Sequence, residues 1–486
     1  MGQSVQPQSE EVRQAMRWAD ECGIVVDAFV TERGTQRSTQ TYGIDTGVFI
    51  CKTCAVWNSW ASLPRTAAGH YRTVFTCSFY RLPFCMHSLL RSVLPDRPNA
   101  RRYVVGLMSG TSFDGTDAAL AQISGTQDTL QVELVAAHHA PYDANLQQHL
   151  HALSTSGAAP LSHLAALHGQ LSEAYAQAVQ ALMQDAGRSL SDVDLVGVHG
   201  QTLAHVPTPL SDGPAGRGTL QLGAPGALAA ILNCPVVGDF RPADMALHGQ
   251  GAPIIPYFDY TVLGDAQETR LLLNLGGIAN VTVVPEGGAR SDVRAFDTGP
   301  ANMVLDALAD ALFDAPYDAG GAYAQTGTAL TAVVADLIRA DFFTKTPPRS
   351  TGRGAFGADY AQRLWAQVRR RDGDRHDALA TAVLLTASSV YQAYARFIRP
   401  GTPASRLLVS GGGVHNAALM QALRSAFAPI PVASTATAGV NPDMKEALGM
   451  AVLAHEWTHG TATAMPAVTG ATRAARLGAL HLPPAS

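Results

Sequence analysis

The order of apolar segments along the chain constrains its fold more than any other feature. Short strand-like runs come first, followed by helical periodicity and a buried strand, and this order occurs twice. The first set comprises Tyr103–Leu107, Ala118–Ile123, Leu130–Ala137, the helical segments Ala144–Leu153 and Leu161–Ala186, and Asp194–Val198. The second set comprises Thr269–Leu275, Val281–Val284, Val293–Phe296, a helix at Asn302–Leu312, a strand at Arg406–Ser410 and a helix at Ala417–Phe427. This order predicts two similar α/β lobes with a cleft between them.

Residues 1–102 do not follow this pattern. They carry 12 Lys or Arg against 8 Asp or Glu, and show little periodicity beyond a predicted helix at Glu10–Cys22. We therefore predict an N-terminal extension at 1–102, a first lobe at 103–262 and a second lobe at 263–486, whose C-terminal helix returns to the first. Two interpretations of the extension stay open. It is either a poorly ordered segment or upstream sequence included by a wrong start codon, in which case Met86 begins the protein.

Composition excludes several classes of protein. The chain has 486 residues, is 47% hydrophobic and has a net charge of −5, which is typical of a globular enzyme and disfavours a general nucleic-acid binder. No apolar run is long enough for a transmembrane helix, and the polar start MGQSVQPQSEEVRQ lacks a signal core, so we expect a cytoplasmic protein. One CxxC pattern at Cys51 and Cys54, followed by Cys77, Cys85 and His87, is only a weak zinc signal.

A turn rich in Gly, Ser, Thr and Asp follows the first strand of the first lobe. It reads SGTSFDGTD over Ser109–Asp117. Glycines let a backbone approach phosphate closely, hydroxyls donate to it, and carboxylates can hold a hydrated metal ion. The turn has no lysine and is not a Walker loop. We therefore predict phosphate binding by another geometry.

Further glycine turns follow strands in both lobes, at Gly276–Gly277, Gly299–Pro300 and Gly411–Gly413. Ligands of α/β sheets bind at the carboxyl ends of strands, where such turns gather. Asp297 lies at one such strand end, in Phe296–Asn302 (FDTGPAN). It could cap the following helix or act as a general base; Thr298 and Asn302 could also serve as caps and leave Asp297 free.

Two polar loops are candidates for binding a hydroxylated substrate. His199-Gly-Gln201 ends a buried strand, and a second loop holds Asp239, Arg241, Asp244, His248 and Gln250. Arg241 could bind an anion, although an exposed salt-bridged loop and a structural histidine are the simpler interpretations. Asp443 and Glu446 match a helix-capping arrangement, and Glu446 could also reach the cleft.

As a set, these motifs closely resemble the anhydro-N-acetylmuramic acid kinase family, in the superfamily of sugar kinases and actin. The resemblance runs from Tyr103 to the C-terminus and leaves residues 1–102 unmatched. It is carried by GLMSGTSFDGTD, HGQT, QLG, DFRPAD, GQGAP, NLGGIANVT, FDTGPAN, STGR at Ser350–Arg353 and SGGGVHN at Ser410–Asn416. It implies two actin-like, ribonuclease-H-like lobes around an ATP cleft, and a homodimer.

The resemblance also assigns roles to residues. It implies an ATP-binding loop formed by Gly110, Thr111, Ser112, Phe113, Asp114, Gly115, Thr116 and Asp117. Gly276 and Gly277 would approach the phosphates, and Gly411, Gly412 and Gly413 the adenosine. The sugar candidates are His199, Gln201, Arg241, Asp244, Gln250 and Glu446. Asp297 would be the catalytic base, and Asp114 would hold Mg²⁺ through water.

The implied reaction belongs to cell-wall recycling. Such kinases open 1,6-anhydro-N-acetylmuramic acid and phosphorylate O6, giving N-acetylmuramic acid 6-phosphate and ADP. The chain departs from the family at His248 and Ala301, where glycine is usual, and at Gly354, where glutamate usually follows STGR. Two alternatives remain: an exopolyphosphatase-like phosphohydrolase, and a sugar-responsive transcription regulator with residues 1–102 as its DNA-binding head. The extension lacks a helix-turn-helix period, which disfavours the regulator.

Overall fold

The computed structural model describes residues 26–28, 49–51, 55–56, 101–110, 112–210, 213 and 215–484. The chain divides into two compact units, Met1–Asp96 and Arg97–Ser486. In the first unit the described residues form short antiparallel strands, β1 (Val26–Ala28), β2 (Phe49–Cys51) and β3 (Ala55–Val56). The predicted helix at Glu10–Cys22 lies outside the described residues, as do Cys54, Cys77, Cys85 and His87. The division after residue 102 and the lobe boundary at 262 stay predictions.

The first lobe of the second unit is built on a mixed sheet. Its strands are β4 (Arg102–Met108), β5 (Gly115–Ser124), β6 (Gln131–Pro141), β7 (Leu195–Val198), β10 (Val236–Gly238) and β16 (Ala479–His481). They are ordered β16-β10-β7-β4-β5-β6. Strands β4, β7 and β10 are parallel, whereas β5 pairs antiparallel with both β4 and β6.

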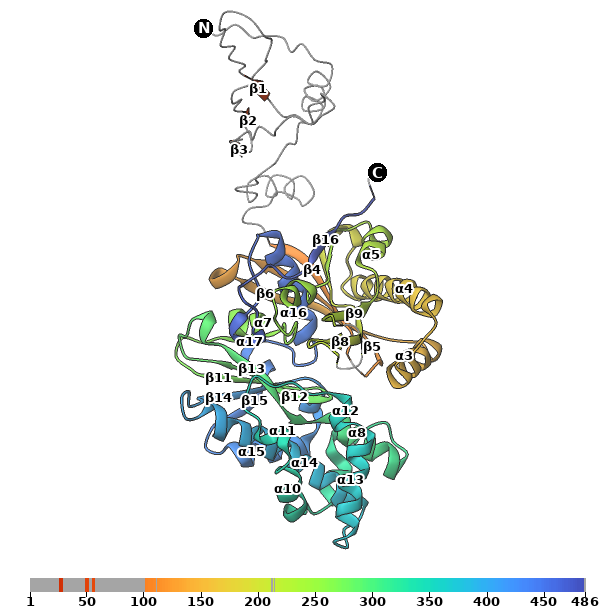
Figure 1. The fold of residues 1–486 in the computed structure, drawn as a ribbon, viewed down its shortest axis with the longest axis vertical. Coiled ribbons are helices and arrows are strands. Elements are labelled where there is room, and N and C mark those ends of the chain that lie inside the picture. The colour runs from red at the N-terminus through yellow and green to blue at the C-terminus, as the bar shows by residue number, and fades with distance from the viewer. Residues whose placement is uncertain are drawn as a thin grey trace, which may run out of the picture. The chain divides into compact units, whose positions relative to one another are not determined.

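The second lobe repeats this topology. Its strands are β11 (Arg270–Leu275), β12 (Ile278–Val284), β13 (Arg294–Pro300), β14 (Arg406–Ser410) and β15 (Val432–Ser434), in the order β13-β12-β11-β14-β15. In each lobe a three-stranded antiparallel meander is extended by two strands parallel to its first strand. The predicted α/β fold with two similar lobes is confirmed, and Figure 1 shows the two sheets one above the other.

Helices cover both faces of the first sheet. On one face lie α3 (Ala144–Ser156), α4 (Leu161–Asp185) and α5 (Pro225–Leu232), which share a core with Val105, Leu107 and Leu120 (Figure 1). On the other face α16 (Lys445–Thr458) packs on β4 and β7. A Cβ on Gly106 would lie 1.8 Å from the carbonyl oxygen of Ala447, and one on Gly197 would lie 2.3 Å from that of Met450. These glycines let the backbone of α16 rest directly on the sheet.

The helices of the second lobe gather on the side of its sheet that faces away from the first lobe (Figure 1). They include α8 (Asn302–Phe313), α10 (Thr331–Leu337), α13 (Ala358–Arg369), α14 (Arg375–Ala393) and α15 (Ala417–Phe427). Leu271, Leu273 and Leu407 point into the core that these helices form. Shorter helices are α9 (Ala322–Thr326), α11 (Asp341–Thr344) and α12 (Arg353–Phe356).

Two segments connect the lobes. One runs from α7 (Pro256–Leu263) into β11, and the other from β15 through η7 (Thr435–Ala438) into α16. Lys445, the first residue of α16, donates to Asp259 of α7 at 3.0 Å, and both side chains are almost completely buried. This ion pair joins the two connecting segments.

The structure lengthens several predicted strands. β6 runs to Pro141, β12 begins at Ile278, and β13 runs to Pro300, so the turn predicted at Gly299–Pro300 lies inside a strand. β5 begins at Gly115 rather than Ala118, because Gly115 already pairs with Pro141 and Asp117 with Met108. Three residues that the sequence placed in the phosphate turn therefore belong to a strand. Among the described residues, no helix is both long and apolar enough to span a bilayer.

Candidate active site

The turns that end β11 and β13 are bonded to each other. Ala301 N–H donates to Gly277 O at 3.1 Å, and Asn302 N–H donates to Gly276 O at 3.1 Å. The Asn302 side chain donates to Leu275 O at 2.9 Å. The main chain of FDTGPAN is thereby fixed against the Gly276–Gly277 turn.

The turn after β14 packs on the same edge of the sheet. Gly411 has a φ of +80°, and its N–H donates to Pro442 O at 2.9 Å. A Cβ on Gly413 would lie 2.5 Å from the Cβ of Leu275, where β11 ends. Glycine suits both the left-handed backbone and the close approach. The predicted phosphate and adenosine turns of the second lobe, including Gly412, therefore meet at one sheet edge.

Buried hydroxyl groups hold the turn after β4 in the first lobe. Ser109 Oγ lies 2.8 Å from Tyr142 Oη, and Thr116 donates to the same hydroxyl at 3.0 Å. Phe113 has a φ of +59° and is buried, with its ring edge-on to His151. Phe113 and Thr116 thus point inward, and they could serve a ligand only through their main chain.

The exposed tip of this turn carries the polar groups. Ser112 Oγ donates to Asp114 Oδ1 at 2.7 Å, and both residues face solvent. Gly110 O accepts from Gln201 Nε2 at 2.9 Å, which ties the turn to the strand β8 (Gln201–Val206). Thr111 lies outside the described residues. The tip is therefore braced on both sides while its carboxylate and hydroxyl stay accessible.

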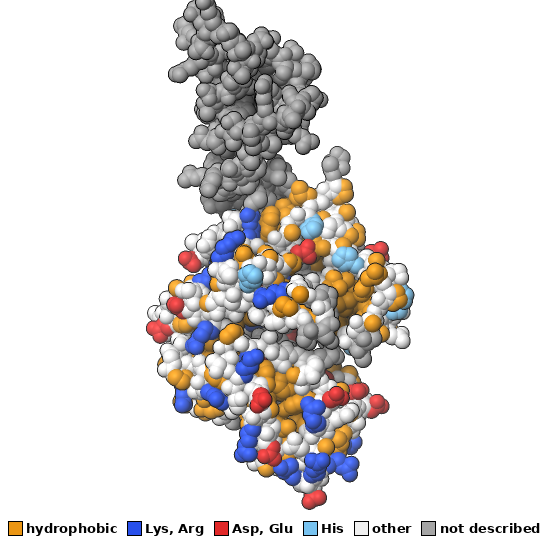
Figure 2. Space-filling model, in the orientation of Figure 1, with side chains coloured by type: hydrophobic (Ala, Val, Ile, Leu, Met, Phe, Trp, Pro, Cys, Tyr) orange, Lys and Arg blue, Asp and Glu red, His pale blue; other side chains and the backbone are white. Residues whose placement is uncertain are grey.

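Carboxylates from both lobes influence one another electrostatically across this region. Burial raises the pKa of Asp117, His139 at 2.8 Å lowers it, and the charges of Asp114 and Asp443 raise it further. Burial, together with the charge of Asp114, raises the pKa of Asp306 on α8 to about 7. The surface is hollowed between the two lobes (Figure 2). Such crowding of negative charge favours a cation or proton at this place.

Asp297 lies within β13, which continues to Pro300, so the prediction that it ends a strand is wrong. One of its carboxylate oxygens is engaged. Thr351 N–H donates to its Oδ2 at 2.7 Å, and no described residue donates a hydrogen bond to Oδ1. Burial raises the pKa of Asp297 to about 6, while the Thr351 N–H and the charge of Arg349 lower it. A carboxylate with a pKa near neutrality and a free oxygen is suited to general-base work.

The alternative interpretation of Asp297 as a helix cap is wrong. The N-cap of α8 is Ala301, which has no side-chain cap hydrogen bond. Thr298 Oγ1 donates instead to Ala279 O at 3.1 Å. The capping interpretation of Asp443 and Glu446 is also wrong, since the N-cap of α16 is Met444 and Asp443 pairs with His415 at 2.8 Å.

His199 and Arg241 form a fixed pair in the first lobe. Arg241 Nε donates to His199 Nε2 at 3.0 Å, while His199 Nδ1 donates to Gly200 O at 2.7 Å, which defines a neutral tautomer. Burial and the charge of Arg241 lower the pKa of His199 to about 3. Arg241 Nη1 also donates to Gly251 O at 2.8 Å. His199 therefore orients Arg241 and does not carry charge itself.

Asp244 lies beneath the second polar loop. It is fully buried and accepts from Gly251 N–H at 2.8 Å and from Thr469 Oγ1 at 2.7 Å. Gln250 N–H donates to Thr469 O at 2.8 Å. Thr469 belongs to α17 (Pro466–Thr469), which contacts β13. Helix α17 thus joins this loop to the strand that carries Asp297, and Asp244 acts on the loop's main chain.

Glu446 connects the two groups of predicted ligands. Burial raises its pKa; the charge of Asp117 raises it further, whereas Lys445 and Arg241 lower it. Asn274 at the end of β11 donates to Glu446 Oε1 at 3.5 Å. Glu446 therefore lies close enough to Asp117 of the Ser109–Asp117 turn and to Arg241 to interact electrostatically with both.

The sequence was compared with those of known proteins. Residues 102–483 match the model of a family described as anhydro-N-acetylmuramic acid kinase. The chain belongs to this family. A protein named anhydro-N-acetylmuramic acid kinase from Salinibacter ruber (strain DSM 13855 / M31) is 51% identical over 385 residues, which cover 79% of this chain and 97% of the relative. A protein of the same name from Caldanaerobacter subterraneus subsp. tengcongensis is 38% identical over 384 residues, 78% of this chain and 97% of that relative.

The structure explains how two departures from the family motifs are accommodated. His248 has a φ of +68°, a backbone conformation in which glycine is favoured and histidine is among the tolerated residues. Its main-chain oxygen accepts from Arg217 at 2.9 Å. Ala301 is fully buried in the hydrophobic core of the second lobe, so its methyl group does not project into the site beside Asp297.

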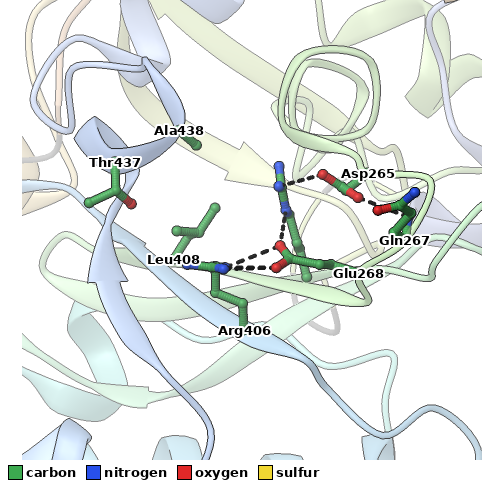
Figure 3. Close-up of a pocket in the computed structure, with 8 residues that line it drawn as sticks. Asp265, Gln267, Glu268, Arg406, Leu408, Thr437 and Ala438 are labelled. Atoms are coloured by element: carbon green, nitrogen blue, oxygen red, sulfur yellow. Dashed lines mark hydrogen bonds and ion pairs between the residues drawn. The ribbon is translucent and has the colours of Figure 1, made fainter.

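A pocket of about 250 Å³ lies away from these residues, at the start of β11 and β14. Figure 3 shows its charged side chains paired with one another: Glu268 accepts from Arg406 at 2.8 Å and from Arg270 at 3.1 Å. Arg270 is also paired with Asp265. The acidic and basic side chains of this pocket thus pair with one another. These ion pairs hold the segment between α7 and β11, and we do not include the pocket in the candidate site.

Sequence reasoning missed Asp306 and Arg349. Asp306 follows Asn302 by four residues on α8, so the two share the helix face nearest the glycine turns; helical spacing could have indicated it. Arg349 precedes STGR but is separated from Asp297 by 52 positions, and no local pattern links them.

Proposed function

We propose that this protein is an ATP-dependent anhydro-N-acetylmuramic acid kinase. It opens the anhydro ring of 1,6-anhydro-N-acetylmuramic acid and phosphorylates O6, giving N-acetylmuramic acid 6-phosphate and ADP, a step of cell-wall recycling. Membership of the kinase family over residues 102–483 carries this proposal. Its chemistry is supported by the half-buried Asp297 carboxylate with one open oxygen.

Asp297 acts as the general base. Its ionised carboxylate takes a proton from water as the water oxygen attacks C1 of the sugar. The C1–O6 bond breaks, O6 attacks the γ-phosphorus of ATP, and ADP leaves with the electrons of the cleaved P–O bond. The Thr351 N–H on Oδ2 leaves Oδ1 to take the proton. Because the two bond changes share O6, positioning of the sugar against ATP supplies most of the catalysis.

The glycine turns hold the nucleotide. Gly110, Ser112, Asp114 and Gly115 approach from the first lobe, and Gly276–Gly277 faces the phosphates from the second. Gly411–Gly413 borders the adenosine. Main-chain N–H groups in such turns cradle phosphate oxygens without a lysine. This assignment is supported by the way the turns of the second lobe are bonded to one another at one sheet edge.

The sugar binds beside Arg241 and Glu446. Arg241 is oriented by His199 and presents a guanidinium, which suits the lactyl carboxylate of the muramic acid. Gln201 Oε1 is buried without a hydrogen-bond partner among the described residues and can accept from a sugar hydroxyl. Gln250 lines this side through a loop that Asp244 supports.

Mg²⁺ fits the donors present at the nucleotide turn. Asp114 would hold the ion through water, and Asp117 and Glu446 add negative charge nearby. Within the described residues, no three His, Cys, Asp or Glu side chains gather closely enough to hold a metal. That agrees with Mg²⁺, which keeps several waters and binds substrate phosphates. When bound, the ion offsets phosphate charge.

Family resemblance and the use of ATP also support a cytoplasmic homodimer. Light scattering on a size-exclusion column tests the dimer, and cell fractionation tests the location. A monomer at micromolar concentration, or recovery outside the cytoplasm, would contradict these two inferences without touching the reaction.

The test of the function is sugar-dependent ADP release. Purified full-length protein is incubated with Mg²⁺ and ATP, with and without the anhydro sugar, and both ADP and free phosphate are measured. We expect ADP only with the sugar, and no matching free phosphate. Free phosphate released in step with ADP would instead indicate a phosphohydrolase. Asp297→Asn is expected to lose about 10²-fold or more in turnover while still binding ATP.

A further inference from the structure

Arg349 occupies an unusual position directly beside Asp297. It is 6% exposed and follows α11 on the loop that leads into STGR. Its Nε donates to Asp297 O at 2.9 Å, and Asp297 N–H donates to Arg349 O at 3.2 Å. Both main-chain polar groups of Asp297 are therefore bonded to this one residue.

The Arg349 guanidinium also binds the main chain of residues 342–345, which precede it in the sequence. Nη1 donates to the carbonyl oxygens of Phe342, Phe343 and Lys345 at 3.0, 3.1 and 3.0 Å. Among the described residues, every acceptor printed for this guanidinium is a main-chain oxygen, including Thr298 O at 3.5 Å from Nη2. A lysine could not reproduce several bonds in one plane.

Aromatic rings enclose the same guanidinium. Its central carbon lies 4.8 Å from the ring centroid of Phe342, 5.3 Å from Phe397 and 5.5 Å from Phe296. Phe296 is the neighbour of Asp297 on β13. Contact with ring faces stabilises a cation that has lost its water. The loop and the strand are thus joined by packing as well as by hydrogen bonds.

The position of Arg349 also affects the Asp297 carboxylate, through Thr351 two residues further along the chain. Fixing the Arg349 main chain fixes the path to Thr351, whose N–H donates to Asp297 Oδ2 at 2.7 Å. We propose that Arg349 is a positioning residue for this reaction: it sets the Arg349–Thr351 segment so that one oxygen of Asp297 is held and the other faces the sugar. This inference rests on the proposed role of Asp297 as the base.

Arg349 acts in two separable ways. Its fork positions the segment, and its charge favours the ionised form of Asp297. Burial lowers the pKa of Arg349 to about 10, the charge of Asp297 raises it, and the charge of Arg396 lowers it further. On the neighbouring strand β12 the residue paired with Asp297 is Asn280, which does not titrate.

Substitutions separate the two effects. Arg349→Lys keeps the charge and loses the fork, whereas Arg349→Met loses both. Arg294→Met is the matched control. Arg294 lies on β13, the strand of Asp297, and its guanidinium also donates to other segments, to Phe397 O at 3.2 Å and Thr402 Oγ1 at 3.1 Å. Asp297→Asn is measured beside them, and thermal melts confirm that each variant is folded.

The decisive readout is the pH profile of kcat/KM for the sugar. In the unmodified protein the acidic limb should fall through a midpoint near 6, the pKa of Asp297. For Arg349→Met we expect the midpoint to rise by about 1 pH unit, the usual effect of losing an adjacent opposite charge. Its kcat should fall roughly 10- to 100-fold through misplacement, with KM for ATP within about twofold. Arg349→Lys should keep the midpoint and lose kcat.

The outcomes distinguish this inference from the function on which it rests. If Asp297→Asn keeps normal turnover, the base assignment fails and the inference fails with it. If Asp297→Asn is inactive but Arg349→Met and Arg349→Lys keep the normal midpoint and kcat, the positioning role alone is overturned. If Arg349→Met does not fold, Arg349→Lys decides: an unchanged kcat overturns the role. A shift in Arg294→Met equal to that in Arg349→Met would show a general strand effect and also overturn it.

Discussion

Replacing Asp297 by Asn should make the protein more stable at neutral pH while lowering its turnover about 10²-fold or more. Burial raises the pKa of Asp297 from 3.8 to about 6, so the folded protein binds this proton more tightly than the unfolded chain does. Stability from this group is therefore highest below pH 4, falls as the pH rises to about 6 and stays low above it. A difference of about 2 pKa units corresponds to about 3 kcal/mol.

Asn removes this cost because it carries no charge and can still accept from the Thr351 N–H. We expect a gain of about 1–3 kcal/mol at pH 7.5, since the new amide group must also be solvated or bonded. For a lobe-sized unit this raises the melting temperature by roughly 2–4 °C per kcal/mol.

The assay is the melting temperature of both proteins from pH 4 to pH 8. Asp310→Asn, at an exposed position of α8, is the control for a general effect of removing one negative charge. The Asp297→Asn advantage should be present at pH 7.5 and vanish near pH 4. An advantage that does not vary with pH, or a variant less stable than the parent at pH 7.5, would refute the reasoning.

Three other substitutions test the frame and the ligand sites. Gly106→Ala should lower the free energy of unfolding by about 3 kcal/mol or more, because its Cβ would lie 1.8 Å from Ala447 O. Gly169→Ala, with open space around its Cβ, is the control. Equal melting temperatures for the two variants would contradict the packing of α16. His199→Ala should raise KM for the sugar roughly tenfold, by leaving the buried Arg241 Nε without its acceptor, and spare KM for ATP; an unchanged sugar KM would remove the pair from the sugar site. Asp114→Ala should raise the Mg²⁺ concentration needed for half-maximal rate, and an unchanged dependence would place the ion elsewhere.

Much of the fold could be predicted from the sequence because its signals are local. The apolar runs and glycine turns mark the strand ends, and their order repeats, which is enough to indicate two similar lobes. The strand end predicted at Phe296 is wrong, because β13 continues through Asp297 to Pro300 and pairs with β12. Helix α16 illustrates the limit: nothing in its own segment shows that it lies against Gly106 and Gly197.

The capping interpretations were wrong for a related reason. A polar residue before a helix can cap it, but residues distant in the sequence can bind the same side chain instead. Here Thr351 binds Asp297, and His415 binds Asp443. Arg349 was missed because its role depends on contact with a strand far away in the sequence. Asp306 was accessible to helical spacing, yet its significance comes from Asp114 in the other lobe.

The central claim is that Asp297 couples ring opening by water to phosphorylation of O6. Mass spectrometry of the sugar product formed with ATP and Mg²⁺ tests it most directly. We predict one product, heavier than the anhydro sugar by a phosphoryl group plus water, and no product of either step alone from Asp297→Asn. A product heavier by the phosphoryl group alone would contradict the account, because it would mean that the anhydro ring stays closed.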